Sequence, residues 1–166
     1  MDETSLEFMP LPQITSDRRT LAQLLAASAG YGHDLDPCVQ SAHWQHPEPP
    51  MDGVDLIGLH VRKDVGHAEA LRLMARADMR PGFPEEAVRL ALQHPDAFLC
   101  DRPYLAAGRM ALQAGKMTPY VLEILRDARN IIHFDLVPTT GTWAMASEYI
   151  FLVAPDAKKG TARVRT

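Results

Sequence analysis

One stretch of the chain, Val54 to Pro95, constrains the fold more than any other. It opens with the apolar run LIGLHV, which is typical of an inner strand covered on both faces. Apolar residues at helical spacing follow, and Pro81 and Gly82 end that pattern because neither residue sustains a helix. A second helical pattern starts at Pro84, with acidic residues in its first turn. The stretch therefore predicts one buried strand followed by two short helices set at an angle.

The flanking segments predict a further helix, a long loop and several strands. Residues 18–30 repeat apolar residues at helical spacing, with N-cap candidates at 15–17 and Gly30 as a left-handed stop. Residues 31–53 contain four prolines and three histidines, which predicts an irregular connection. The rest of the chain has short apolar runs between turn residues, which predicts antiparallel strands over 104–110, 119–125, 131–137 and 148–154.

Two of these runs predict a hairpin. YVLEIL and IIHFDLV are joined by residues 126–130, whose length and composition suit a tight connection. This arrangement places Ile132, Phe134 and Leu136 on one face of the second strand. An alternative is a helix that starts at Pro119 and continues through Arg129.

Length and composition indicate one folded domain. A chain of 166 residues that is 46% hydrophobic and 23% charged is typical of a globular domain with a substantial core. We expect a single α+β domain over residues 15–155, with an antiparallel or mixed sheet and about three helices packed on it. Residues 1–14 are expected to form an extended arm, or an edge strand around Leu6 to Met9, and residues 156–166 a basic tail.

Charge, cysteine count and hydropathy argue against several classes of protein. A formal net charge of −4 argues against nucleic-acid binding through a basic face. Two cysteines are too few for a disulfide framework, which favours a reducing compartment. No signal peptide and no apolar run of about 18 residues is readable, so we expect a cytoplasmic protein without a membrane span. The sequence has no glycine-rich phosphate loop, and we expect no cofactor.

The order of several motifs resembles that of an uncharacterised family of small bacterial hypothetical proteins. The matching pieces are LIGLHV, EALRLMARADMRPGFPEEAVRLALQHP, PYLAAG and EYIFLVA, which together span Val54 to Ala154. Members of that family show a strand ending in histidine, a helix, an R-P-x-x-x-E-E turn and helix, an A-x-G strand and a last strand like R-F-L-A-V. The resemblance implies one α+β domain and brings no activity with it. This chain departs from the family at Pro138 to Trp143, where a tryptophan-rich hairpin would be expected.

The loop of residues 31–53 holds the densest set of candidate metal ligands. His33, Cys38, His43 and His46 offer imidazole and thiolate groups, which suit zinc. Structural zinc sites use two ligand pairs at defined spacing, and this loop offers one such pair. The competing interpretation is a surface loop that is rich in histidine.

Three residues are candidates for catalysis. His60 and His133 lie at strand positions and would approach each other if their strands were neighbours in the sheet. Cys100, beside Asp101, is a candidate thiol nucleophile with His94 as its base. The competing interpretation is that the histidines are partly buried structural residues and that Cys100 is a small apolar one.

The sequence contains no catalytic or cofactor motif of known mechanism, which favours a non-enzymatic role. We expect an interaction or structural module, phage-derived or part of a larger assembly, that binds a protein partner or itself. Trp44, Trp143 and Met145 are the candidate contact residues. Two alternatives stay open: a small hydrolase or transferase that uses histidine or cysteine, and a metal- or carbohydrate-binding domain that uses the loop of residues 31–53.

Overall fold

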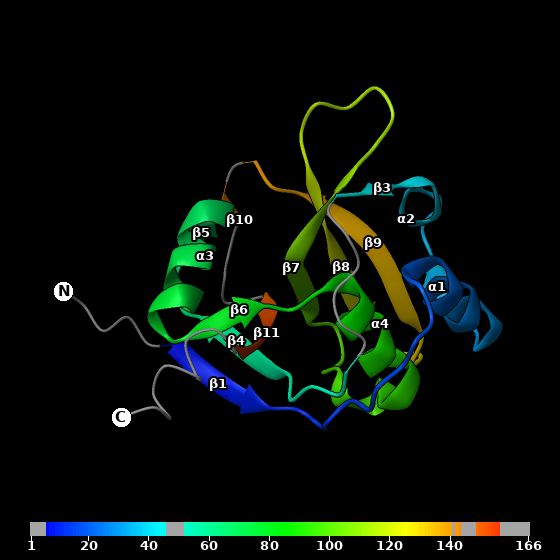
Figure 1. The fold of residues 1–166 in the computed structure, drawn as a ribbon, viewed down its shortest axis with the longest axis horizontal. Helices are drawn as coiled ribbons and strands as arrows, with labels where there is room; N and C mark the ends of the chain where they lie inside the picture. Colours follow the sequence, from blue (N-terminus) through cyan, green and yellow to red (C-terminus); the bar gives the residue numbers. More distant parts are fainter. Residues whose placement is uncertain (1–5, 46–51, 141, 144–148, 157–166) are drawn as a thin grey trace.

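The computed structural model describes residues 6–45, 52–140, 142–143 and 149–156, which form one mixed sheet with helices on both faces (Figure 1). Within that part of the chain the sheet has nine strands, and its main path runs β1-β4-β11-β7-β8-β9-β2. In that order the strands are β1 (Leu6–Pro10), β4 (Ile57–Val61), β11 (Ile150–Pro155), β7 (Pro103–Leu112), β8 (Tyr120–Arg126), β9 (Ile132–Pro138) and β2 (Asp34–Leu35). Off this path, β3 (His43–Trp44) pairs with β7 and β6 (Met79–Pro81) pairs with β11, while β5 (Val65–Gly66) and β10 (Thr142–Trp143) form a separate two-stranded sheet.

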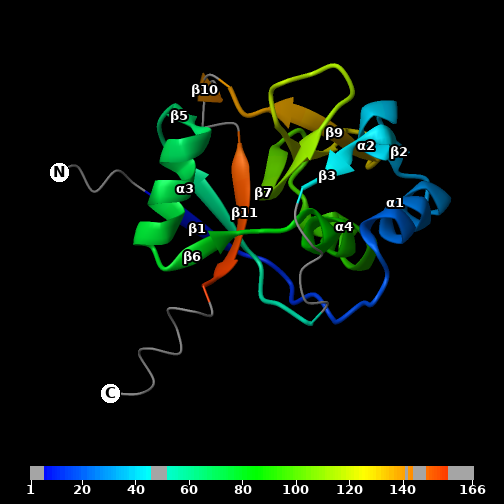
Figure 2. The same ribbon diagram turned by 45° about the horizontal axis from the view of Figure 1, so that its top comes forward.

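The helices of the described chain lie on opposite faces of the sheet. They are α1 (Leu21–Gly30), α2 (Pro37–Ser41), α3 (His67–Arg76) and α4 (Pro84–Gln93), with a 3-10 turn, η1 (Pro95–Ala97). Figures 1 and 2 show α3 apart from α1 and α4, which lie together on the other side. The predicted α+β class with a mixed sheet is confirmed. The described chain has four α-helices rather than about three, because the predicted irregular loop contains α2.

Alternation along the strands divides the core in two. On β7, Tyr104 and Ala106 pack with α1 and α4, while Leu105 and Ala107 pack with α3. The predicted face of β9 is confirmed, since Ile132, Phe134 and Leu136 all belong to the core under α1 and α4. Successive strand residues point to opposite faces, so a sheet covered on both sides needs apolar residues at nearly every position.

The first strand and the residues after it pack as part of the domain. β1 pairs antiparallel with β4, which agrees with the edge strand predicted around Leu6 to Met9. Ile14 is fully buried and forms an antiparallel bridge with Val54. The buried guanidinium of Arg89, on α4, donates to the Thr15 and Asp52 carbonyl oxygens at 2.7 Å each. Residues 6–14 are therefore fastened to the domain, which fits the predicted edge strand and not the alternative of an extended arm.

The segment that leads into α4 passes very close to β7. The Gly82 N–H donates to the Leu152 carbonyl at 2.7 Å, and the Gly108 N–H donates to the Gly82 carbonyl at 2.8 Å. A Cβ atom on Gly108 would lie 2.7 Å from the Gly82 oxygen, which is shorter than side chains tolerate. The β7–β8 register shifts between Ala106 and Ala111, so this approach coincides with an irregularity in β7. Glycine is required on β7 because backbone meets backbone there.

Two acidic residues at the start of α4 form ion pairs with different strands. Glu85 is fully buried and pairs with Arg109 of β7, which is 4% exposed. Glu86 accepts from Arg80 at 2.8 and 2.9 Å and also accepts the Phe83 N–H at 2.9 Å. Acidic residues in the first turn were expected to face the helix dipole. The structure adds specific cations, which fix α4 to β7 and to β6.

Candidate functional site

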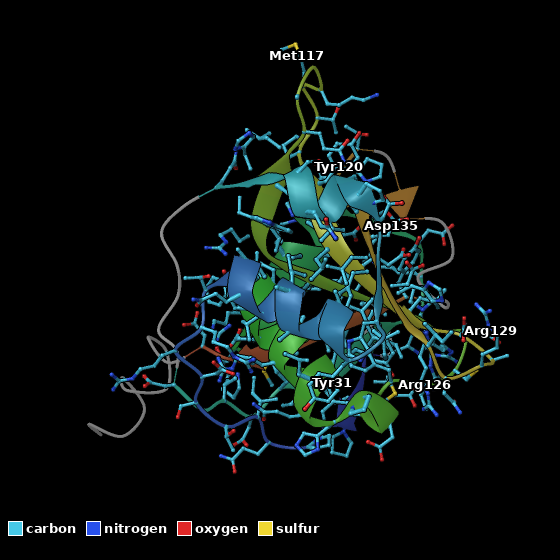
Figure 3. All side chains as sticks on the ribbon, turned by 90° about the vertical axis from the view of Figure 1, so that its right-hand side faces the viewer. Tyr31, Met117, Tyr120, Arg126, Arg129 and Asp135 are labelled. Carbon is cyan, nitrogen blue, oxygen red and sulfur yellow. The ribbon has the colours of Figure 1, made fainter. Side chains whose placement is uncertain are left out.

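The exposed face of α1 borders a groove at the β9–β2 end of the sheet. The groove has a volume of about 270 Å³ and is lined by Ala22, Leu25, Ala26, Ala29, Leu35 and Gln40. We call it the α1 groove. In Figure 3 this side of the molecule faces the viewer, with Tyr31 and Asp135 labelled around it. It is a candidate site for binding another molecule.

Local sequence fixes α1 through a reciprocal cap. The Thr20 hydroxyl accepts the Gln23 N–H at 3.2 Å, and the Gln23 side chain accepts the Thr20 N–H at 2.8 Å. The N-cap is therefore Thr20 and not one of residues 15–17, since Asp17 is engaged with Arg19. Gly30 is the last residue of the helix, but it does not have the predicted left-handed conformation. Gly32 has that conformation, with φ of 84°.

The buried and exposed faces of α1 differ in size of side chain. Leu21, Leu24, Leu25 and Ser28 are buried, as their spacing predicted. Ala22, Ala26 and Ala29 are exposed and follow one another at helical spacing along the groove. Tyr31, at the C-cap, is 75% exposed. The side of α1 that borders the groove therefore carries small apolar side chains.

The opposite wall of the groove comes from β2 and α2. The Asp36 carboxylate accepts the Cys38 N–H at 2.9 Å and Pro37 occupies the first turn, so α2 begins there. Val39 is 1% exposed and anchors α2 in the core. Leu35 and Gln40 then face the groove.

A histidine lies between two carboxylates where β2 meets β9. His133 Nδ1 is 2.9 Å from Asp34 Oδ2, and His133 Nε2 is 2.8 Å from Asp127 Oδ2. These hydrogen bonds raise the pKa of His133, with that to Asp127 as the larger cause. His133 in turn lowers the pKa of Asp127, which also accepts the Ile131 and Arg129 N–H groups. The network joins β2 to the β8–β9 hairpin.

The candidate metal ligands are only partly brought together. Cys38 lies with Asp36 and Asp135, and one ligand atom from each falls within 4.8 Å of the others. The Cys38 thiol donates to Asp135 at 3.5 Å, so hydrogen bonds account for this grouping. His33 packs its ring near Phe134, and its pKa is lowered by burial. His43 is exposed on β3, and His46 lies outside the described residues.

The two cysteines are expected to react at different rates. Burial, together with the Asp36 and Asp135 carboxylates, raises the pKa of Cys38 to about 12, whereas Cys100 is exposed. Burial and then Asp101 also raise the pKa of Cys100. The thiolate is the reactive form, so alkylation by iodoacetamide at about pH 8 should be at least roughly tenfold slower at Cys38.

Peptide mass spectrometry over time would measure both rates, with Cys100→Ser isolating the reaction at Cys38. Equal rates at the two thiols would contradict the environment assigned to Cys38.

The catalytic candidates lie apart from one another. His60 is on β4 and His133 is on β9, with β11, β7 and β8 between them in the sheet. The His60 ring is 3.4 Å from Glu7 of β1. Cys100 forms an isolated bridge with Arg126, and the His94 ring is 3.1 Å from the Gln13 carbonyl. The structure therefore does not pair the two histidines, and catalysis at any of the three residues stays a prediction.

Of the predicted contact residues, Trp44 is half-buried and packs against the core under α1 and α4. Trp143 is in β10, although its side chain is not described, and Met145 lies outside the described residues. Among the described residues, the sequence analysis did not single out the exposed apolar side chains of Phe8, Tyr31 and Leu99, while Met117, which it left open as a binding residue, is 97% exposed. The three alanines of α1 could have been recognised from the sequence, because they recur at helical spacing beside the buried leucines.

Comparisons with known proteins give no match to a family model, a curated protein or a solved structure. None of the described helices is long and apolar enough to cross a membrane. The family resemblance read from the sequence stays a prediction.

Proposed function

We propose that the protein is a non-enzymatic protein-interaction module, whose α1 groove binds a helical segment of a partner that carries basic residues. The α1 groove carries the proposal. It is open and lined largely by apolar side chains, and exposed apolar surface of this kind is typical of sites that another molecule covers.

The shape of the groove favours a helix as its occupant. Ala22, Ala26 and Ala29 form a row of small side chains, which lets a second helix approach the α1 backbone closely. Leu35 supplies apolar contact from the opposite wall.

Charge favours basic residues on that helix. Asp34 and Asp36 are exposed on the segment that follows α1, and Asp135 is exposed on β9. The C-terminal end of α1 also carries the negative end of its dipole. At the other end of the helix Arg19 is paired with Asp17 at 2.7 Å. A cationic segment that lies over the C-terminal half of α1 meets complementary charge.

A panel of three synthetic helical peptides of equal length tests the proposal. The first has an apolar face flanked by lysine and arginine, the second has the same face flanked by glutamate, and the third scrambles the apolar residues of the first. We expect the first peptide to bind best in fluorescence anisotropy. When this peptide is added, the chemical-shift changes of the protein's backbone amides should centre on Ala22, Ala26 and Leu35.

Two matched variants define where binding occurs. Ala26→Arg places a long cation in the middle of the groove and should weaken binding of the first peptide at least about tenfold, a loss of about 1.4 kcal/mol. Ala114→Arg makes the same change on the exposed β7–β8 loop and should leave the affinity unchanged. Equal binding of the scrambled peptide, or shifts away from α1, would contradict the proposal. Analytical sedimentation tests whether the protein binds itself through the groove. If the protein self-associates and Ala26→Arg abolishes that association, a second copy of the chain occupies the groove, and the assignment of a separate partner is wrong.

A further inference from the structure

We infer that His133 is a pH-sensitive latch, which fastens β2 to the edge of the sheet while its ring carries two protons. The inference starts from geometry, because each ring nitrogen faces a carboxylate oxygen from a different element. Asp34 belongs to β2, and Asp127 belongs to the β8–β9 loop.

Only the imidazolium form satisfies both contacts. A neutral imidazole has one N–H donor, and its second nitrogen presents a lone pair. With distances of 2.9 and 2.8 Å on the two sides, a neutral ring would direct that lone pair at an ionised carboxylate. Protonation converts this repulsion into a second charge-assisted hydrogen bond. Loss of the proton therefore weakens one of the two contacts, whichever nitrogen releases it.

The charges that surround His133 are mostly negative. Arg129 is the cation of the network, and its Nη2 is 3.1 Å from Asp127 Oδ2, the oxygen that faces the histidine. On β8, the residue directly opposite His133 is Leu125, while Glu123 lies opposite Asp135. The Arg126 guanidinium is directed to Asn130 and to the Phe98 carbonyl. The acidic groups of the elements that meet here are Asp34 and Asp36 of the β2–α2 segment, Asp127 of the hairpin loop, Asp135 of β9 and Glu123 of β8.

Besides the latch, β2 is held by a short strand pairing, and α2 after it is held by Val39 and by the Cys38–Asp135 hydrogen bond. β2 is two residues long and pairs in parallel with His133 and Phe134. The Asp36 N–H donates to the Phe134 carbonyl at 3.0 Å, and Leu35 packs against the core. Short edge strands open locally at low cost in free energy. A contact that titrates can therefore set how often this strand opens.

The direction of the pH effect follows from the two pKa shifts. The pKa of His133 is raised in the folded protein, so its contribution is complete below the ordinary histidine pKa of about 6.5 and is lost as the pH rises through the raised value. The pKa of Asp127 is lowered, so its contribution is present above the ordinary aspartate pKa and is lost only as the pH falls through the lowered value. The latch is closed in the mildly acidic range between these limits.

Opening of the latch would also move a wall of the α1 groove, because Leu35 belongs to β2. This last step rests on the proposed function. The latch itself does not, since its test needs no partner.

Side-chain NMR and amide hydrogen exchange on the full chain test the latch. Between about pH 6 and about pH 8.5, we expect the His133 ring to keep both N–H protons above the pH at which a histidine with the ordinary pKa of about 6.5 becomes neutral. Over the same range, protection of the Asp36 amide, corrected for intrinsic exchange, should fall roughly five- to tenfold. Amides within the β8–β9 hairpin should keep their protection.

Three variants complete the test. Asp34→Asn changes an exposed side chain and should abolish the pH dependence at Asp36, and His133→Gln should do the same. His43→Gln removes an exposed histidine elsewhere and should behave like the wild type. The inference is overturned if His133 loses its second proton at the ordinary histidine pKa of about 6.5, or if protection at Asp36 is independent of pH in the wild type. If these tests succeed but the protein binds no peptide, the inference about the latch stands and the proposed function is wrong.

Discussion

Replacing Arg109 by methionine is expected to lower the free energy of unfolding by about 3–5 kcal/mol, as measured by urea denaturation. Glu85 is fully buried at the start of α4, and Arg109 supplies its counter-charge from β7. The substitution leaves an ionised carboxylate in the core without a cation. A buried charge in that state costs several kcal/mol or forces the group to take up a proton.

The double variant Glu85→Met with Arg109→Met shows how much of the stability loss comes from leaving one buried charge without its partner. Removal of both charges is expected to restore most of the lost stability, because apolar residues of similar volume replace buried ion pairs well. The control is Lys63→Met, which breaks the pair between Lys63 and Glu69, whose side chains are both 38% exposed. That loss should stay below about 1 kcal/mol. A double variant no more stable than Arg109→Met would argue against the pair as the origin of the effect.

Substitution of Gly108 by alanine is expected to destabilise the protein by about 3 kcal/mol, at the upper end of the range for overpacking. The new Cβ would lie 2.7 Å from the Gly82 oxygen and 2.9 Å from its carbonyl carbon. Both are backbone atoms in the turn before α4, so no side chain can rotate away. Relief requires that the turn move from β7, which would strain the hydrogen bond between Gly108 and Gly82.

Gly30→Ala provides the matched control for this change. A Cβ on Gly30 meets nothing within 4 Å, and the residue is not left-handed. We expect no loss of stability there, and a gain of up to about 1 kcal/mol because alanine restricts the unfolded chain. Thermal and urea unfolding of the two variants, measured side by side, test the pair of expectations. A similar loss for both variants would show that the close approach at Gly108 is not the cause.

Periodic features of the fold could be predicted from the sequence. The buried face of α1 and the core-facing residues of β9 follow directly from apolar spacing, because those residues are selected by burial. Helix α2 escaped prediction, since its five residues are too few for a helical pattern to show. Its start signal, Asp36 followed by Pro37, is local and was readable.

The site depends on contacts that sequence spacing does not reveal. Asp34 and His133 are 99 residues apart, and they meet only because β2 pairs with β9. The same holds for Glu85 and Arg109, which lie on a helix and a strand joined by a long connection. Single-sequence reasoning could propose that His133 is special, but its partners follow from topology. The sequence analysis predicted that His60 and His133 would approach each other if their strands were neighbours. In the sheet their strands, β4 and β9, are not neighbours.

The central position of β11 also bears on how the chain folds. β11 pairs antiparallel with β4 on one side and in parallel with β7 on the other, as Figure 2 shows, and β6 joins it as well. During synthesis the β7–β8–β9 meander can form early because its strands follow one another in the chain, and β1 and β4 are made before it. The main path of the sheet cannot close until β11 has left the ribosome. Until that moment β4 and β7 lack the strand that lies between them, so the two parts of the sheet can join only after β11 has been made.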